Sequence, residues 1–165
     1  MCYSYAMEAV IFIGIQATGK TTFYLERFQD THARINLDSL KTRPREDQLL
    51  EACIRSGRSF VVDNTNVLAR ERAKYIGLAK AAGYTITGYY FQSRLPDALL
   101  RNQQRTGKAV IPEKGVIAKF RALQRPRYAE GFDRLYHVTI DPRGGFQIRE
   151  WVEDGLEKTR PDQSY

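Results

Sequence analysis

The stretch Gly14-Ile-Gln-Ala-Thr-Gly19-Lys20-Thr21 matches GxxxxGK[ST], a pattern typical of a loop that binds phosphate. The glycines let the backbone turn tightly enough for successive N–H groups to point at an anion. We expect Lys20 to reach the β- and γ-phosphates of a nucleoside triphosphate and the Thr21 hydroxyl to bind Mg²⁺. The residues expected to bind the nucleotide here are Gly14, Ile15, Gln16, Ala17, Thr18, Gly19, Lys20, Thr21 and Thr22.

Two acidic residues follow predicted strands, Asp38 after residues 34–37 and Asp63 after residues 59–62. Ligands of α/β proteins bind at the carboxyl ends of strands, so Asp38 could accept the proton of an attacking hydroxyl there. Alternatively, Asp38 only caps the helix that follows. Asp63 resembles a Walker B acid that acts near Mg²⁺, although its Asp-Asn sequence is also typical of a turn.

Arg101 and Arg105 stand four residues apart in a predicted helix, so both should lie on one face of it. A glycine-containing loop follows Arg105 and is of the kind that closes over a bound nucleotide. An arginine there would stabilise charge on a transferring phosphoryl group. Two ordinary exposed arginines would give the same pattern.

Positive charge is concentrated in one part of the chain. The formal net charge is +7, and residues 94–127 hold nine basic residues against two acidic ones, so the remainder is neutral. This block indicates a polyanionic partner or a nucleotide, although a solvated helical face would explain it equally well. In the predicted helix 112–125, Lys114, Arg121 and Arg125 lie opposite the apolar side chains, and Tyr128 could stack on a base.

These residues must be positioned by strands that alternate with helices, an order typical of βαβ units. Strands are predicted over residues 9–15, 34–37, 59–62, 84–91 and 136–140, with an edge strand over 146–152. Helices are predicted over residues 21–29, 45–56, 69–82, 96–105 and 112–125. The expected fold class is α/β, a P-loop NTPase three-layer sandwich with a mainly parallel sheet and a helical lid.

The length of 165 residues, 42% of them hydrophobic, fits a single domain. Residues 1–7 and 153–165 are expected to be loose ends, with Met1 or Met7 as the start. No apolar run approaches the roughly 18 residues of a membrane span, and no secretory signal is visible. Two isolated cysteines argue against a disulfide framework or a zinc site and favour a reducing, cytoplasmic location. Cys2 would lie in the loose N-terminal end and Cys53 in the core.

The motifs GxxxxGKT, INLD, VVDNTN and RNQQRTGKAVIP occur in the order seen in polynucleotide 5′-kinases. The chain resembles the kinase domain of the phage enzyme and of the eukaryotic phosphatase/kinase over roughly residues 9–140. It is more similar still to small stand-alone bacterial proteins described only as predicted kinases or ATPases. The resemblance implies ATP as the donor, Mg²⁺ as the cofactor and the 5′ end of a nucleic acid as the acceptor.

The resemblance also implies roles for single residues. Asp38 would be the general base, and Arg101 and Arg105 would be lid arginines that contact the donor phosphates. The acceptor would be bound by Asp38, Lys41, Asp63 and Thr65. Two positions depart from the family pattern: Leu37 replaces an arginine, and Lys41 replaces an arginine that contacts the acceptor's phosphate. Because lysine lacks the bidentate fork of arginine, the grip on the acceptor should differ.

Three functions therefore stay open at the level of sequence. The leading one is ATP-dependent phosphorylation of a 5′-hydroxyl of DNA or RNA. The second is a small-molecule kinase of the zeta-toxin or antibiotic phosphotransferase type, which the changes at Leu37 and Lys41 favour. The third is a nucleotide-dependent switch without transfer, against which Asp38 argues because a switch needs no base.

Overall fold

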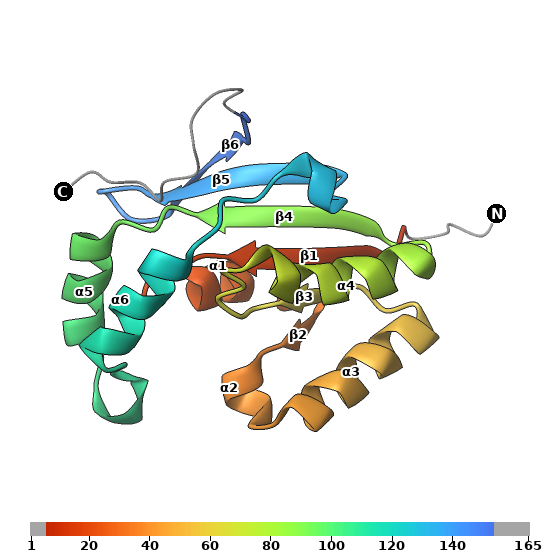
Figure 1. Cartoon of the computed structure of the whole chain (residues 1–165), viewed down its shortest axis with the longest axis horizontal. Helices are drawn as coiled ribbons and strands as arrows, with labels where there is room; N and C mark the ends of the chain where they lie inside the picture. Colours follow the sequence, from red (N-terminus) through yellow and green to blue (C-terminus); the bar gives the residue numbers. More distant parts are fainter. Residues whose placement is uncertain (1–5, 154–165) are drawn as a thin grey trace.

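The computed structural model describes residues 6–153, and its strands form one sheet in the order β2-β3-β1-β4-β5-β6 (Figure 1). Five strands run parallel and the edge strand β6 pairs antiparallel with β5. The strands are β1 (Glu8–Ile13), β2 (Ala33–Ile35), β3 (Phe60–Val62), β4 (Thr85–Phe91), β5 (Arg134–Ile140) and β6 (Phe146–Glu150). The predicted α/β fold with a mainly parallel sheet is confirmed.

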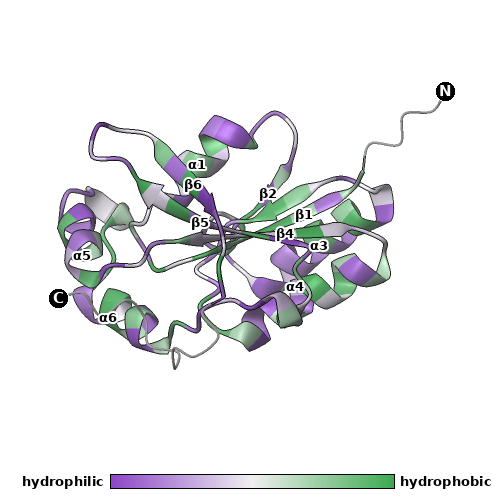
Figure 2. Cartoon of the chain, turned by 90° about the horizontal axis from the view of Figure 1, so that it is seen from above, coloured by the Kyte–Doolittle hydropathy of each residue, from purple (hydrophilic) through white to green (hydrophobic). Residues whose placement is uncertain are grey.

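Helices cover both faces of this sheet and its carboxyl edge. They are α1 (Lys20–Arg27), α2 (Leu37–Leu40), α3 (Arg43–Ser56), α4 (Ala69–Ala81), α5 (Leu95–Gln103) and α6 (Glu113–Ala122), with 3-10 turns η1 (Gly107–Ala109) and η2 (Tyr128–Glu130). Figure 2 shows α1 on one face of the sheet and α3 and α4 on the other. In Figure 1, α5 and α6 lie beyond the arrowheads of β1 and β4, at the carboxyl ends of the strands.

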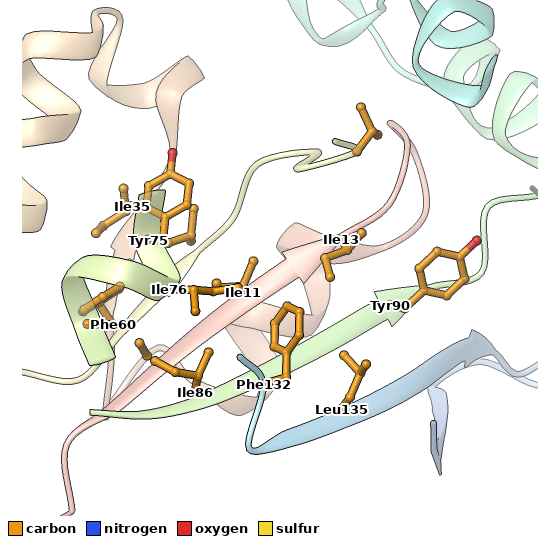
Figure 3. Close-up of a cluster of buried hydrophobic side chains, with 14 of the residues drawn as sticks. Ile11, Ile13, Ile35, Phe60, Tyr75, Ile76, Ile86, Tyr90, Phe132 and Leu135 are labelled. Atoms are coloured by element: carbon orange, nitrogen blue, oxygen red, sulfur yellow. The ribbon is translucent and has the colours of Figure 1, made fainter. Parts of the chain in front are cut away.

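Residues 9–13 of strand β1 are buried and contribute to two apolar clusters. Val10 and Phe12 pack with Phe23 of α1, whereas Ile11 and Ile13 belong to the larger cluster on the opposite face (Figure 3). A strand buried on both faces is expected to be apolar throughout, and residues 9–13 are. Burial of each Val, Ile or Phe side chain here contributes about 1.5–3 kcal/mol, so β1 holds the start of the following loop in a fixed position.

The region around Asp38 differs from its predicted structure. Strand β2 ends at Ile35, and Asn36 caps a short helix by accepting a hydrogen bond from the Ser39 N–H at 3.0 Å. Asp38 therefore lies in the first turn of α2. The interpretation of Asp38 as the cap of the next helix is wrong, because Thr42 caps α3.

Two predicted helices are shorter than expected. Helix α5 ends at Gln103, so Arg105 lies beyond it and the expectation that Arg101 and Arg105 share a helix face is wrong. The chain turns because the Asn102 side chain accepts from the Ile111 N–H at 3.0 Å and donates to the Ile111 carbonyl at 2.7 Å. Helix α6 ends at Ala122, and Arg125 leaves the predicted basic strip to lie 4.8 Å from the Trp151 ring centre.

The expectation of a loose N-terminal segment is wrong for Met7. Its carbonyl accepts from the Thr85 N–H at 2.9 Å, in line with the pairing of β1 and β4. Cys53 is buried, as predicted, whereas Cys2 and residues 154–165 lie outside the described residues. Within residues 6–153, no helix is long and apolar enough to cross a membrane.

Candidate active site

The phosphate-binding loop follows β1, where the strand order changes direction between β3 and β4. Ligands of open α/β sheets bind at such a switch point, outside the carboxyl ends of the strands. The loop is tied to both neighbouring strands, because Gly14 N–H donates to the Thr65 carbonyl at 2.9 Å and Ile15 N–H donates to the Ser93 hydroxyl at 3.1 Å. These two bonds fix where the loop leaves the sheet.

Close packing explains the first and last glycines of the motif. A Cβ at Gly14 would lie 3.0 Å from the Cβ of Phe91, in the neighbouring strand. Gly19 has a φ of +92°, and a Cβ there would lie 2.9 Å from the ring of Phe146. Larger residues would strain the backbone or move the loop, so both glycines are required by this packing.

Lys20 is buried beneath the loop that precedes it. Its ammonium donates to the Gly14 carbonyl at 2.9 Å and to the Ile15 carbonyl at 2.6 Å. The pKa of Lys20 is lowered to about 8, mainly by burial; the charge of Arg105 acts in the same direction, and the charges of Asp63 and Asp38 act in the opposite one. The charges of Asp38, Asp63 and Arg105, which come from three separate segments, therefore act on the ammonium of Lys20.

Thr21 and Asp63 supply oxygen atoms at one place on the same edge of the sheet. The Thr21 hydroxyl donates to Asp63 Oδ2 at 3.1 Å, and the Asp63 side chain is 2% exposed. Mg²⁺ prefers oxygen ligands and commonly takes only one or two from the protein beside substrate phosphates. Among residues 6–153 no group of three His, Cys, Asp or Glu side chains could hold a metal ion.

Arg34 joins this pair and was missed by the sequence reasoning. Its guanidinium lies 2.7 Å from Asp63 Oδ2 and 3.1 Å from the Thr21 hydroxyl. Residue 34 was assigned only as the start of a strand. A signal was present, because a charged residue in the middle of a short strand between apolar neighbours needs a buried partner.

Short hydrogen bonds hold the turn that carries Asp38. The Asn36 side chain donates to the Asp63 carbonyl at 2.6 Å, and the Leu37 N–H donates to Asn64 Oδ1 at 2.9 Å. Both contacts join the start of α2 to the segment after β3. Asp38 itself is exposed to solvent.

Glu46 holds the side chain of Asn64 by a hydrogen bond, and the sequence reasoning did not identify it. This carboxylate is fully buried in α3, and it accepts from the Asn64 amide at 3.0 Å, from the Tyr75 hydroxyl at 2.7 Å and from Arg43 at 3.0 Å. Burial, followed by the hydrogen bond to Glu46, raises the pKa of Tyr75. Tyr75 therefore stays a neutral donor, and the network links α3 and α4 to the turn of Asp38.

The remaining predicted acceptor residues lie on different sides of this turn. Lys41 is exposed at the end of α2 with a φ of +75°, a conformation that is uncommon for lysine. Thr65 is half-buried, and its carbonyl is the one that anchors Gly14. Thr65 thus connects the segment after β3 to the phosphate-binding loop.

The segment from α5 to η1, which the sequence predicts as the lid, contacts the phosphate-binding loop through α5. Arg101 donates to the Ala17 carbonyl at 3.3 Å, and Ala17 has a φ of +61°. Arg105, in the turn after α5, donates to the Ala109 carbonyl at 3.4 Å.

Thr22 is exposed on α1, and Gln16 is half-buried in the loop. Tyr128, suggested as a stacking platform, is half-buried and donates to the Trp151 carbonyl at 3.4 Å.

Comparisons with known proteins point to the same class of site. The AAA_33 family model, described as an AAA domain, matches residues 10–127. A protein of Acanthamoeba polyphaga mimivirus, named as a bifunctional polynucleotide phosphatase/kinase, is 27% identical over 143 residues, or 81% of this chain and 33% of the relative. The bifunctional polynucleotide phosphatase/kinase of Schizosaccharomyces pombe is 26% identical over 135 residues, with 79% and 33% covered. The chain thus spans about a third of the length of these relatives.

Solved structures share the fold at low sequence identity. The AvrRxo1-ORF1:-ORF2 complex with ATP has a TM-score of 0.67 at 18% identity, with 88% of this chain and 58% of that chain covered. The Pnkp1/Rnl/Hen1 RNA repair complex has a TM-score of 0.57 at 19% identity, with 72% and 44% covered. These likenesses show the fold alone. The AAA_33 family match covers residues 10–127, which include the phosphate-binding loop.

Proposed function

We propose that this chain, which belongs to the AAA_33 family of AAA domains, transfers the γ-phosphoryl group of ATP to the 5′-hydroxyl of DNA or RNA. Membership of this P-loop kinase family supports binding of a nucleoside triphosphate. The observation that carries the proposal is the geometry of the site: Lys20 is bound to the carbonyls of the phosphate-binding loop, and the turn that exposes Asp38 is hydrogen-bonded to the segment after β3. A phosphate-binding lysine, an exposed acid and a lid arginine are the parts that in-line phosphoryl transfer requires.

In the proposed reaction, the carboxylate of Asp38 accepts the proton of the acceptor hydroxyl as its oxygen attacks the γ-phosphorus. The bond from the γ-phosphorus to the β,γ-bridging oxygen breaks, and ADP leaves. Lys20, the loop N–H groups and Arg105 stabilise the negative charge on the transferring group. Thr21 and Asp63 would hold Mg²⁺, which when bound neutralises charge on the phosphates.

Two further observations support a nucleic-acid acceptor. Both curated relatives are named as polynucleotide phosphatase/kinases. Lys114 and Arg121 are exposed on α6, in the segment that carries the excess positive charge. An exposed basic surface next to the site would attract the phosphate backbone of a bound strand. Arg125 contributes less to such a surface, because its guanidinium packs on Trp151.

The test is incubation with γ-labelled ATP, Mg²⁺ and short 5′-hydroxyl DNA and RNA oligonucleotides. We expect label on an oligonucleotide and a loss of about 10²–10⁴-fold in Asp38→Ala, the usual contribution of a general base. Asp30→Ala, which removes an exposed acid near the end of α1, is the matched control and should keep its rate. Transfer at the wild-type rate by Asp38→Ala would refute the assignment of the base.

A small-molecule acceptor is the second candidate, and the acceptor side of the site favours it. Leu37 and Lys41 flank Asp38 where the resemblance leads one to expect arginines, so two contacts to a nucleic-acid phosphate are altered. Label on a metabolite and not on oligonucleotides would support this candidate. Either transfer reaction would exclude a nucleotide switch without chemistry.

A further inference from the structure

Arg34 is the middle residue of β2, and its side chain points to the face of the sheet that α1 covers. Its neighbours Ala33 and Ile35 pack in the cluster on the other face. The guanidinium lies 5.8 Å from the ring centre of Tyr24, so the apolar part of α1 covers it from one side. The Arg34 side chain is 27% exposed, so solvent reaches part of it.

Arg34 donates to the same two oxygen atoms that would hold the divalent cation. Its Nε and Nη2 atoms lie 2.8 and 2.7 Å from Asp63 Oδ2, and Nη2 lies 3.1 Å from the Thr21 hydroxyl. Arginine stays protonated at all accessible pH values, so this positive charge is permanent. The buried carboxylate is therefore already neutralised by a side chain of the chain itself.

We propose that Arg34 is a positioning residue that acts through Thr21 and Asp63 and competes with the divalent cation for them. The proposal rests on the proposed function only in that a nucleotide must bind at the loop. A cation that approaches Thr21 meets a guanidinium within hydrogen-bond distance of the same oxygen, and the two like charges repel. In the absence of metal, the same guanidinium keeps both oxygens in place and adds positive charge beside the phosphates.

The consequence is weak coupling between metal and nucleotide. Coupling is reciprocal, so if Arg34 lowers the affinity for the cation more in the nucleotide-bound chain than in the free chain, it reduces by the same factor the gain in nucleotide affinity that the cation brings. A purely structural ion pair would affect the stability of the fold when removed, and it would leave the metal dependence of nucleotide binding unchanged. This difference separates the proposal from the ordinary function of an ion pair.

The experiment measures binding of Mn²⁺ by electron paramagnetic resonance in the presence of ADP, for the wild-type chain and for Arg34→Gln. A neighbouring charge commonly shifts an equilibrium about tenfold or more, so the Mn²⁺ midpoint should fall about tenfold in Arg34→Gln. Arg55→Gln removes an exposed arginine paired with Glu51 and should leave the midpoint unchanged. An unchanged midpoint in Arg34→Gln would overturn the proposal.

Two further measurements keep the test decisive if Arg34→Gln folds poorly. Arg34→Lys retains the charge but loses the fork, so its midpoint should stay near that of the wild type. In the wild-type chain, Mg²⁺ should strengthen ADP binding by less than about tenfold relative to EDTA, at the low end of usual couplings. A gain of about 100-fold would overturn the proposal. The two proposals can fail separately. If no oligonucleotide is labelled but the Mn²⁺ midpoint shifts in Arg34→Gln, the nucleic-acid acceptor is wrong and the role of Arg34 is supported.

Discussion

The donor side of the site is built from backbone that is hydrogen-bonded into the sheet, whereas the acceptor side rests on a helix of four residues. Gly14 and Ile15 are each anchored to the segment after a neighbouring strand, and Lys20 is buried under them. Asp38 and Lys41 are both exposed on α2 and at its end. The donor side must fit a triphosphate of fixed geometry, whereas the acceptor side can change without disturbing the sheet.

This contrast explains where the chain keeps and where it departs from the pattern of the kinases that it resembles. The loop motif is complete, and close packing against Phe91 and Phe146 allows little change at its glycines. The departures, Leu37 and Lys41, are on the acceptor side, where α2 is joined to the rest through Asn36, Leu37 and Asn64. A change of acceptor therefore needs few substitutions, and the loop need not move.

The largest expected effect is that of substituting Lys20 in the phosphate-binding loop, compared with substituting Lys41 at the end of α2. Lys20→Ala should abolish nucleotide use, with at least about 10²–10³-fold lost, because it removes a charge that the phosphates need in a buried site. Lys41→Ala should keep ATP binding and raise only the KM for the acceptor. Titration with ADP and steady-state transfer assays measure both. Equal loss of ADP affinity in Lys41→Ala would show that the two sides are not separate.

A substitution of the buried Glu46 tests whether its hydrogen-bond network positions the turn that carries Asp38. Glu46→Gln removes a charged acceptor from Asn64, Tyr75 and Arg43, which should cost about 1.5–3 kcal/mol of folding free energy. It should also lower kcat about tenfold with unchanged ADP affinity, since the turn of Asp38 loses its support. Glu51→Gln, on the exposed side of the same helix, should cost less than about 1 kcal/mol.

Urea unfolding and kcat measurements together check this prediction. A stability loss in Glu46→Gln without any fall in kcat would mean that Glu46 holds α3 and α4 together and does not position Asp38. Loss of ADP affinity would contradict the division between the two sides, because none of the contacts of Glu46 reaches the phosphate-binding loop directly.

The smallest expected effect is a dependence of the donor side on pH. Burial lowers the pKa of Lys20 to about 8 from 10.5, and a bound phosphate requires the charged form. ADP affinity should therefore be constant below pH 8 and fall above it, by up to about tenfold per pH unit. Measurement of ADP affinity from pH 7 to 9.5 checks the prediction, and a flat profile would contradict it.

Stability should change in the opposite direction over the same window. Because the pKa of Lys20 is lower in the folded chain, the unfolded chain binds more protons between about pH 8 and pH 10.5. The cost of burying the charged ammonium, on the order of 3 kcal/mol, applies below pH 8 and is relieved as the pH rises. Lys20→Met should lack this rise, which isolates Lys20 from other groups that titrate there.

Most strands and helices could be predicted because their apolar periodicity is local. The run of residues 9–13 and the alternation of strands with helices were sufficient for the α/β sheet. The ends of α5 and α6 were predicted too far along the chain. The Asn102 side chain is bound to Ile111 where α5 ends, and the Gln124 N–H donates to the Val67 carbonyl at 2.8 Å just beyond α6. Both ends therefore depend on partners outside the helix itself.

The sequence by itself determined the phosphate-binding loop of this protein, because such a loop needs a fixed spacing of glycine, lysine and threonine within eight neighbouring residues. Only the tertiary structure decided the surroundings of Asp63 and Asp38. Arg34 and Glu46 reach them from β2 and α3. The charge of Arg34 between apolar neighbours indicates a buried partner, but the sequence does not say which residue that partner is. Side chains that neutralise or brace a buried carboxylate are chosen by distance in space, which a linear spacing does not encode.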